Sequence, residues 1–140
     1  MAVWLLDVNA LLALAWEEHA FHARILARMV GLNGDRWASC AITQLGFMRL
    51  SSTPGLLQPA LTPGKARGVL EGLVTHPKHQ FLRDLPLAPV ELVGELGALK
   101  GYRQITDAYL IRLARHHRAG ILTFDRGMRQ LAPDVAELVS

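Results

Sequence analysis

Hydrophobic and polar positions alternate along the chain in blocks that have the lengths of strands and helices. An apolar run over residues 2–6 ends at a carboxylate, which predicts a parallel strand covered on both faces. Residues 9–32 then carry apolar side chains at helical spacing and predict a helix, with a break near His19 left open. The chain therefore begins with a strand followed by a helix.

The same alternation continues to the end of the chain. The clearest later helix, residues 106–118, is predicted to be capped by Thr106 and to lead into a buried strand at 119–124. The other predicted elements are a strand at 36–42, a helix at 43–52 capped by Thr43, a helix from Thr62 as N-cap and Pro63 to residue 76, a weak strand at 80–85, a short helix over 89–101 ended by Gly101, a short helix at 126–131, and an edge strand at 135–139.

Strands that alternate with helices predict an α/β fold, a three-layer α/β/α domain with a mainly parallel central sheet. The 140 residues form one domain, 1–140, because the sequence contains no internal repeat, linker or low-complexity segment.

Composition narrows the function classes only slightly. Fifteen Lys and Arg against twelve Asp and Glu give a formal charge of +3, a mild bias toward anionic partners such as nucleic acid. Cys40 is the only cysteine, so no internal disulfide forms and a reducing cytoplasm is expected. The apolar N-terminal run lacks a basic region and carries Asp7, which argues against a signal peptide and a membrane span.

Three aspartates give the strongest chemical signal. Asp7 and Asp125 follow predicted strands, and Asp107 lies in the first turn of a helix, on the face expected to pack against the sheet. Each carboxylate alone is explained as a helix cap or by the helix dipole. Together at one sheet edge they would repel one another unless a cation neutralised them, and carboxylate oxygens suit Mg²⁺ or Mn²⁺.

A hard cation on carboxylates beside a basic surface suits hydrolysis of phosphodiesters by metal-activated water. The sequence has no GxSxG elbow, no GxxxxGK[ST] phosphate loop and no GxGxxG turn after a strand. A phosphoacceptor domain with Asp7 as nucleophile is less suitable, because the adjacent acidic pair and the late lysine that such chemistry needs are missing.

Four segments, "LLDVNALLAL", "ITQLGF", "ITDAYLIRLA" and "ILTFDRG", in this order and spacing resemble a PIN domain of the VapC toxin type. The resemblance implies a Mg²⁺-dependent (or Mn²⁺-dependent) cytoplasmic endoribonuclease, a homodimer inhibited by a small cognate antitoxin. It also implies that Asp7, Asp107 and Asp125 are catalytic metal ligands, with Asn9, Thr43 and Thr123 as polar supports. The same acids would also serve a DNA nuclease.

The chain departs from the family pattern at Gly46, where a glutamate is common. One carboxylate fewer lowers both repulsion and metal affinity, so we expect a weaker or single-metal site. Gly46 leaves room for the RNA backbone or marks a catalytically silent RNA-binding or regulatory module, which is the alternative function.

Contacts to RNA are harder to locate. Arg49 and Arg126 lie closest in sequence to the predicted site and are the preferred RNA contacts, while Arg112, Arg115 and Arg118 form a further basic group. Three histidine pairs suggest zinc but have no cysteine partners, so solvated surface is expected. Residues 56–73 are interpreted either as a groove for an amphipathic antitoxin helix or as a flexible cover over the core.

Overall fold

A computed structural model describes all residues, 1–140. At its centre lies a five-stranded sheet in the order β3-β2-β1-β4-β5, and all four neighbouring pairs are parallel. The strands are β1 (Val3–Leu6), β2 (Arg36–Cys40), β3 (His79–Leu82), β4 (Gly120–Thr123) and β5 (Ala136–Leu138). The parallel sheet and its helical layers confirm the predicted α/β/α class.

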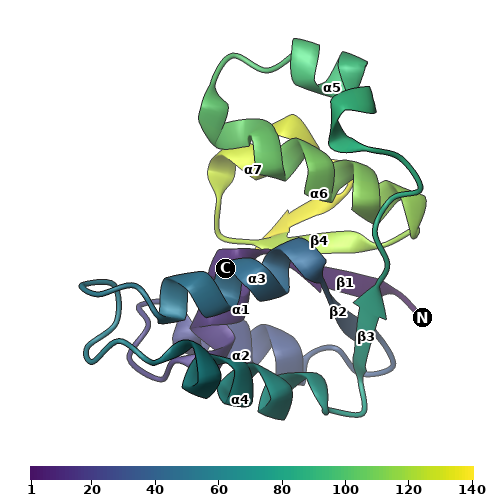
Figure 1. The fold of residues 1–140 in the computed structure, drawn as a ribbon. Helices are drawn as coiled ribbons and strands as arrows, with labels where there is room; N and C mark the ends of the chain where they lie inside the picture. The colour runs from purple at the N-terminus through teal and green to yellow at the C-terminus, as the bar shows by residue number, and fades with distance from the viewer.

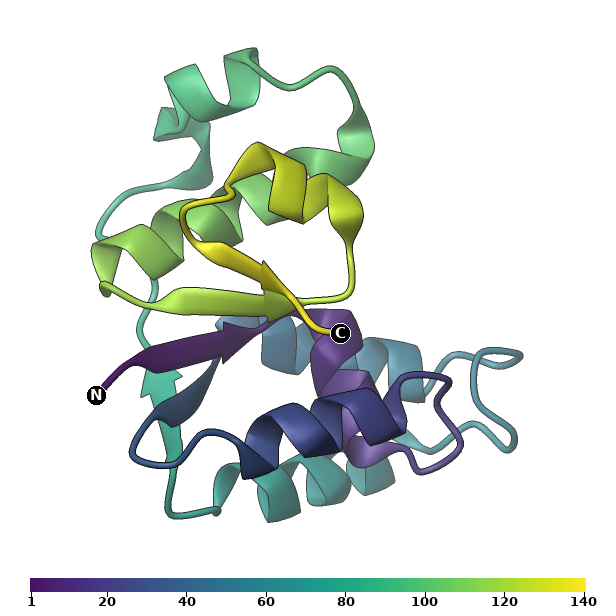
Figure 2. The same cartoon turned by 180° about the vertical axis from the view of Figure 1, so that it is seen from behind.

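Helices lie on both sides of this sheet (Figures 1 and 2). In Figure 1 the helices α5 to α7 lie above the central strands, α1, α2 and α4 lie below them, and α3 runs at the height of β1. The helices are α1 (Val8–Ala15), α2 (His22–Val30), α3 (Ala41–Ser51), α4 (Pro63–Val74), α5 (Val93–Gly97), α6 (Ile105–His116) and α7 (Arg126–Leu131), with 3₁₀ turns η1 (Pro89–Glu91) and η2 (Tyr102–Gln104). None of these helices is long and apolar enough to cross a membrane.

Alternate residues of the central strands fill two separate cores. Leu5 and Ile121 pack with the apolar side chains of α6, whereas Leu6 and Leu122 pack with those of α1 and α2. All four side chains are fully buried. The uninterrupted apolar run of β1 thus reflects a strand covered on both faces, as the sequence predicted.

Two predictions about the long first helix can be compared directly with the structure. Residues 16–21 separate α1 from α2, so the break near His19 is real. Asp7 caps α1, since its carboxylate accepts a hydrogen bond from the Ala10 N–H at 2.9 Å. The helix therefore begins where β1 ends, and Asp7 belongs to both elements.

Three predicted helix boundaries are wrong. α3 begins at Ala41 with Cys40 as its N-cap, so Thr43 lies inside the first turn, where its hydroxyl accepts from the Cys40 N–H at 2.9 Å. α6 begins at Ile105 after Gln104, which puts Thr106 inside the helix, and α5 ends at Gly97, with Ala98 as its C-cap, rather than at Gly101. In each case the backbone path, rather than the preferred capping residue, sets the boundary. The predicted Thr62 cap of α4 is confirmed.

Candidate functional site

The acidic residues gather at the point where the sheet changes direction. From β1 the chain adds β2 and β3 on one side, and it later returns to add β4 and β5 on the other. The carboxyl ends of β1 and β4 are therefore neighbours, and ligands of open parallel sheets commonly bind in the crevice at such a switch point. Asp7 directly follows β1, and Asp125 lies two residues after β4.

Thr123 connects these two aspartates. Its buried hydroxyl donates to Asp7 Oδ2 at 2.5 Å and accepts from the Asp125 N–H at 2.9 Å. Asp7 is also buried, and its other oxygen accepts from Ala10. Asp125 caps α7 by accepting from the Gly127 N–H at 2.7 Å. The predicted capping role of Asp125 and its position beside Asp7 are thus both present.

Asp107 adds a third carboxylate from the opposite helical layer. It lies in the first turn of α6, is half-buried and has no side-chain hydrogen bond. Burial, and then the negative charges of Asp125 and Asp7, together raise the pKa of Asp107 to about 6. The three carboxylates therefore lie within electrostatic range of one another.

Burial likewise raises the pKa of Asp7 to about 6, although its bonds from Thr123 and Ala10 oppose the rise and the charge of Asp125 adds to it. A buried acid that is destabilised in its charged form and lies beside other acids has the character of a functional residue. A bound cation would stabilise the charged form of the Asp7 carboxylate.

The carboxylate oxygens of the three aspartates are ligands that suit a hard divalent cation, but they do not surround a single point. No three histidine, cysteine or carboxylate side chains are grouped tightly enough to hold an ion between them. Mg²⁺ needs only one or two direct carboxylates and keeps several of its waters, and Asp107 has both oxygens free of protein hydrogen bonds. The residues therefore fit a partly hydrated ion.

The remaining predicted site residues are not all at this edge. Asn9 is exposed in the first turn of α1, and Arg126 is exposed directly after Asp125. Arg49 lies in the last turn of α3, at the end of the helix remote from β2. Thr43 is fully buried and uses its hydroxyl on Cys40, so its observed contacts support the β2–α3 junction.

Gly46 lies against the first turn of α1 rather than against open space. A Cβ atom built at Gly46 would come within 2.7 Å of Val8 Cγ2, closer than carbon atoms can pack. The expected room for an RNA backbone at Gly46 is therefore taken by Val8, the residue that follows Asp7. A larger residue at position 46 would need Val8 to move.

Sequence reasoning missed a group of side chains on the α1–α2 side of the acidic edge. His19 bonds to Asn9, Phe21 stacks on Phe124, and Arg24 lies over the Phe21 ring. These contacts join a loop to a strand end more than a hundred residues later, so no local pattern announces them. The only sequence signal was the interruption of the helix near His19.

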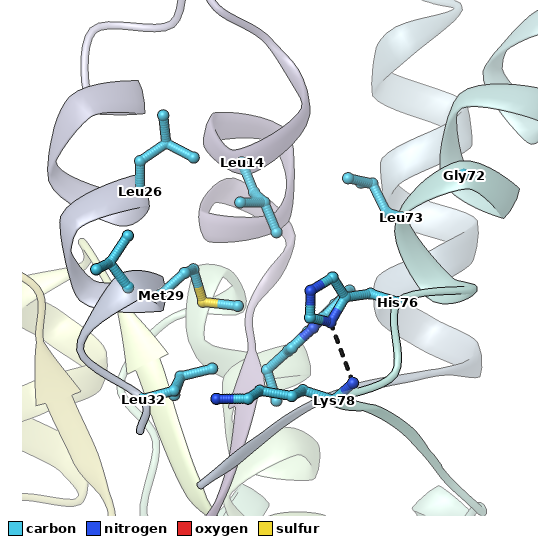
Figure 3. Close-up of a pocket in the computed structure, with 10 residues that line it drawn as sticks. Leu14, Leu26, Met29, Leu32, Gly72, Leu73, His76 and Lys78 are labelled. Carbon is cyan, nitrogen blue, oxygen red and sulfur yellow. Dashed lines mark hydrogen bonds between the residues drawn. The ribbon is translucent and has the colours of Figure 1, made fainter. Parts of the chain in front are cut away.

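An apolar groove of about 460 Å³ lies away from the acids, between α1, α2 and α4 (Figure 3). It reaches Trp37 and Lys78, which lie at the amino ends of β2 and β3, whereas the acids lie at carboxyl ends. Figure 3 shows Leu26 and Met29 of α2 opposite Leu73 of α4, with His76 and Lys78 at one end. The predicted segment 56–73 therefore contributes only Gly72 and Leu73, in the last turn of α4, to this wall.

Comparison with known proteins gives consistent results. The model of the PIN domain family matches residues 4–133. The chain is 43% identical over 129 residues to Ribonuclease VapC38 of Mycobacterium tuberculosis, covering 91% of this chain and 89% of that protein. It is 34% identical to Ribonuclease VapC39 of the same species, covering 91% and 92%.

Among solved structures, VapBC2 from Rickettsia felis bound to a DNA fragment from its promoter has a similar fold. The TM-score is 0.66 over 96% of this chain and 97% of that chain, at 11% sequence identity. This likeness supports the fold assignment alone.

Proposed function

The chain belongs to the PIN-domain family of VapC-type proteins, and on that premise we propose that it is a Mg²⁺-dependent endoribonuclease, the toxin of a toxin–antitoxin pair. The observation that carries the proposal is the link made by Thr123, whose hydroxyl joins the Asp7 carboxylate to the Asp125 backbone beside Asp107. The similarity of the chain to proteins named ribonucleases supports RNA as the substrate.

Mg²⁺ at this edge would supply an activated water near neutral pH and would neutralise charge on the phosphate. Asp7 and Asp107 are the proposed ligands, with Asp125 completing the negative field. Thr123 and Ala10 hold the Asp7 carboxylate in one orientation, so this ligand needs no rearrangement when an ion binds. Asp107 has no such restraint and is free to rotate toward an ion.

The negative charge of the three aspartates also affects how RNA can bind at this edge. Three carboxylates repel a polyanion, so RNA cannot be held here by these residues alone, and basic or neutral donor groups nearby must bind the strand. Arg112 and Arg115 are less suited to this role than the sequence implied, since they pair with Glu95 at 2.5 Å and Asp134 at 2.9 Å. Arg126 has no such partner and remains a candidate for RNA contact.

Cleavage of a labelled single-stranded RNA tests the proposal. We expect cleavage with Mg²⁺ or Mn²⁺, none with EDTA, and a loss of at least about a hundredfold in Asp107→Asn and Asp125→Asn, because each removes a carboxylate from the site. Asp84→Asn is the matched control, since Asp84 is exposed and has no side-chain hydrogen bond. A DNA strand of the same sequence separates RNA cleavage from general nuclease activity.

Equal cleavage by Asp107→Asn and wild type would contradict the site assignment. Calorimetric titration with Mn²⁺ provides an independent reading, because a nuclease of this kind must bind the ion. Binding of RNA without binding of Mn²⁺ would instead indicate a catalytically silent module.

We further propose a small protein partner, as the family resemblance implies and as the fold shared with the VapBC2 assembly supports. The apolar groove between α1, α2 and α4 is the proposed contact surface. Val30, at its edge, is 83% exposed, and such an apolar side chain gains most from being covered by a partner.

A further inference from the structure

The loop between α1 and α2, residues 16–21, contacts the first turn of α1, just after Asp7, and Phe124, just after β4. His19 Nε2 lies 3.0 Å from Asn9 Oδ1, and Asn9 is two residues after Asp7. The Phe21 ring stacks on the Phe124 ring with centroids 4.5 Å apart and planes 24° apart. Because Phe124 lies between Thr123 and Asp125, the loop borders the site on its α1–α2 side.

The hydrogen bonds of His19 determine how Asn9 is presented. The Phe21 N–H donates to His19 Nδ1 at 3.0 Å, so Nδ1 carries no proton and the proton lies on Nε2. Nε2–H must then donate to the amide oxygen of Asn9. This bond holds the Asn9 amide oxygen against His19, and the NH₂ group of exposed Asn9, which has no hydrogen-bond partner in the protein, is a donor for an approaching molecule. Burial lowers the pKa of His19, which favours this neutral form.

Arg24 adds a positive charge to the same border. Its guanidinium lies 5.1 Å from the centroid of the Phe21 ring, close enough for a cation–π contact that fixes its direction. Arg24 is exposed and forms no ion pair, whereas Arg28, one turn later, is paired with Glu137 at 2.6 Å. The charge of Arg24 is therefore not neutralised by a carboxylate of the chain.

We propose that Asn9 and Arg24 form a phosphate-binding subsite for the RNA backbone next to the scissile phosphate, with His19 and Phe21 as the residues that position them. The substrate strand then crosses the α1–α2 loop on its way into the acidic edge. This inference rests on the proposed ribonuclease function and adds the direction from which the substrate enters.

Fluorescence anisotropy of a labelled single-stranded RNA, measured in EDTA over a series of NaCl concentrations, tests Arg24. We expect Arg24→Ala to weaken binding several-fold and to reduce the slope of log K against log salt by about 0.7, the value for one phosphate contact to a single strand. Arg118→Asn is the control, because exposed Arg118 lies at the amino end of β4 and asparagine tolerates its positive φ of 56°. It should change neither quantity.

His19 gives a second, independent test. His19→Ala should weaken RNA binding while leaving the salt slope unchanged, because the neutral ring positions a donor and contributes no charge. His19→Gln keeps an N–H donor near the position of Nε2 and should restore most of the affinity. Equal melting temperatures of the Ala and Gln variants would show that the difference in binding is not one of folding.

Two outcomes separate this inference from the proposed function. RNA cleavage by the wild type, combined with unchanged binding and unchanged salt slope in Arg24→Ala and unchanged binding in His19→Ala, overturns the subsite alone. A wild-type protein that neither binds nor cleaves RNA overturns the proposed function and the subsite together.

Discussion

Asp107 shows the electrostatic cost of the acidic edge at the scale of one residue. Its pKa in the folded protein is about 6, against 3.8 for an unperturbed aspartate. Between these values the folded state binds more protons than the unfolded state, so stability falls as pH rises from about 4 to about 6. Above pH 6 the charged carboxylate destabilises the metal-free protein.

Asp107→Asn should therefore stabilise the metal-free protein at pH 7. We expect a gain on the order of 1 kcal/mol, after allowing for solvent screening of a half-exposed group, and almost no gain at about pH 3, where the carboxyl group is mostly protonated in both states. Urea denaturation in EDTA at the two pH values measures this gain, with Asp84→Asn as the unchanged control. Mn²⁺ should raise the melting temperature of the wild type more than that of Asp107→Asn.

A stability loss in Asp107→Asn at pH 7 would show that the charged carboxylate does not destabilise the folded protein.

Three residues of this site, Asp7, Asp107 and Asp125, were predictable from the sequence because they follow strands or begin helices. His19 and Phe124 were not, because their roles come from contacts between a loop and a distant strand end.

At the scale of elements, the close approach of α1 and α3 depends on Gly46. A Cβ atom there would meet Val8 Cγ2 at 2.7 Å, whereas a Cβ atom at Gly68, in the middle of α4, would meet nothing within 4 Å. Both glycines lie inside a helix, but only Gly46 is in close contact with a neighbouring helix.

Gly68→Ala should stabilise the protein by up to about 1 kcal/mol through helix propensity. Gly46→Ala should destabilise it by roughly 1–3 kcal/mol, because overpacking outweighs that gain. Thermal or urea denaturation of the two variants measures the contrast, and Val8→Ala in combination with Gly46→Ala should remove most of the penalty. If Gly46→Ala proved as stable as Gly68→Ala, Val8 would not limit this position.

The sequence located the strands and helices better than their ends, and the β2–α3 junction and the edge strand β3 show why. β2 passes into α3 without a loop, with Cys40 extended at φ −139° and ψ 177°, and the Thr43 hydroxyl caps this junction from inside the first turn rather than from the N-cap position. β3 was a weak prediction because it is an edge strand with Gln80 and Phe81 exposed, which removes the apolar run that identified β1.

At the scale of the whole molecule, the acidic edge and the apolar groove lie at opposite ends of the strands. A partner bound in the groove and a substrate bound at the acids would therefore depend on different residues. Val30 tests this separation, because it lines the groove and is 83% exposed, whereas Ile25 is the one buried residue of α2.

Val30→Glu should weaken binding of the proposed small protein partner while leaving RNA cleavage intact, because a charge in the groove must be desolvated on binding. Val90→Glu is the matched control, since Val90 is similarly exposed, at 81%, but lies in η1 outside the groove. Calorimetric titration of both variants with the co-expressed partner measures the effect. Unchanged affinity in Val30→Glu would place the partner elsewhere.

The two hydrogen bonds of Thr123 restrict which amino acids can occupy that position. The side-chain oxygen must donate a hydrogen bond to the Asp7 carboxylate and accept one from the Asp125 N–H, and only a short alcohol side chain does both at full burial. In a randomised library, selection for nuclease activity should return serine and threonine, whereas valine, which has the same shape, should be recovered only by selection for folding.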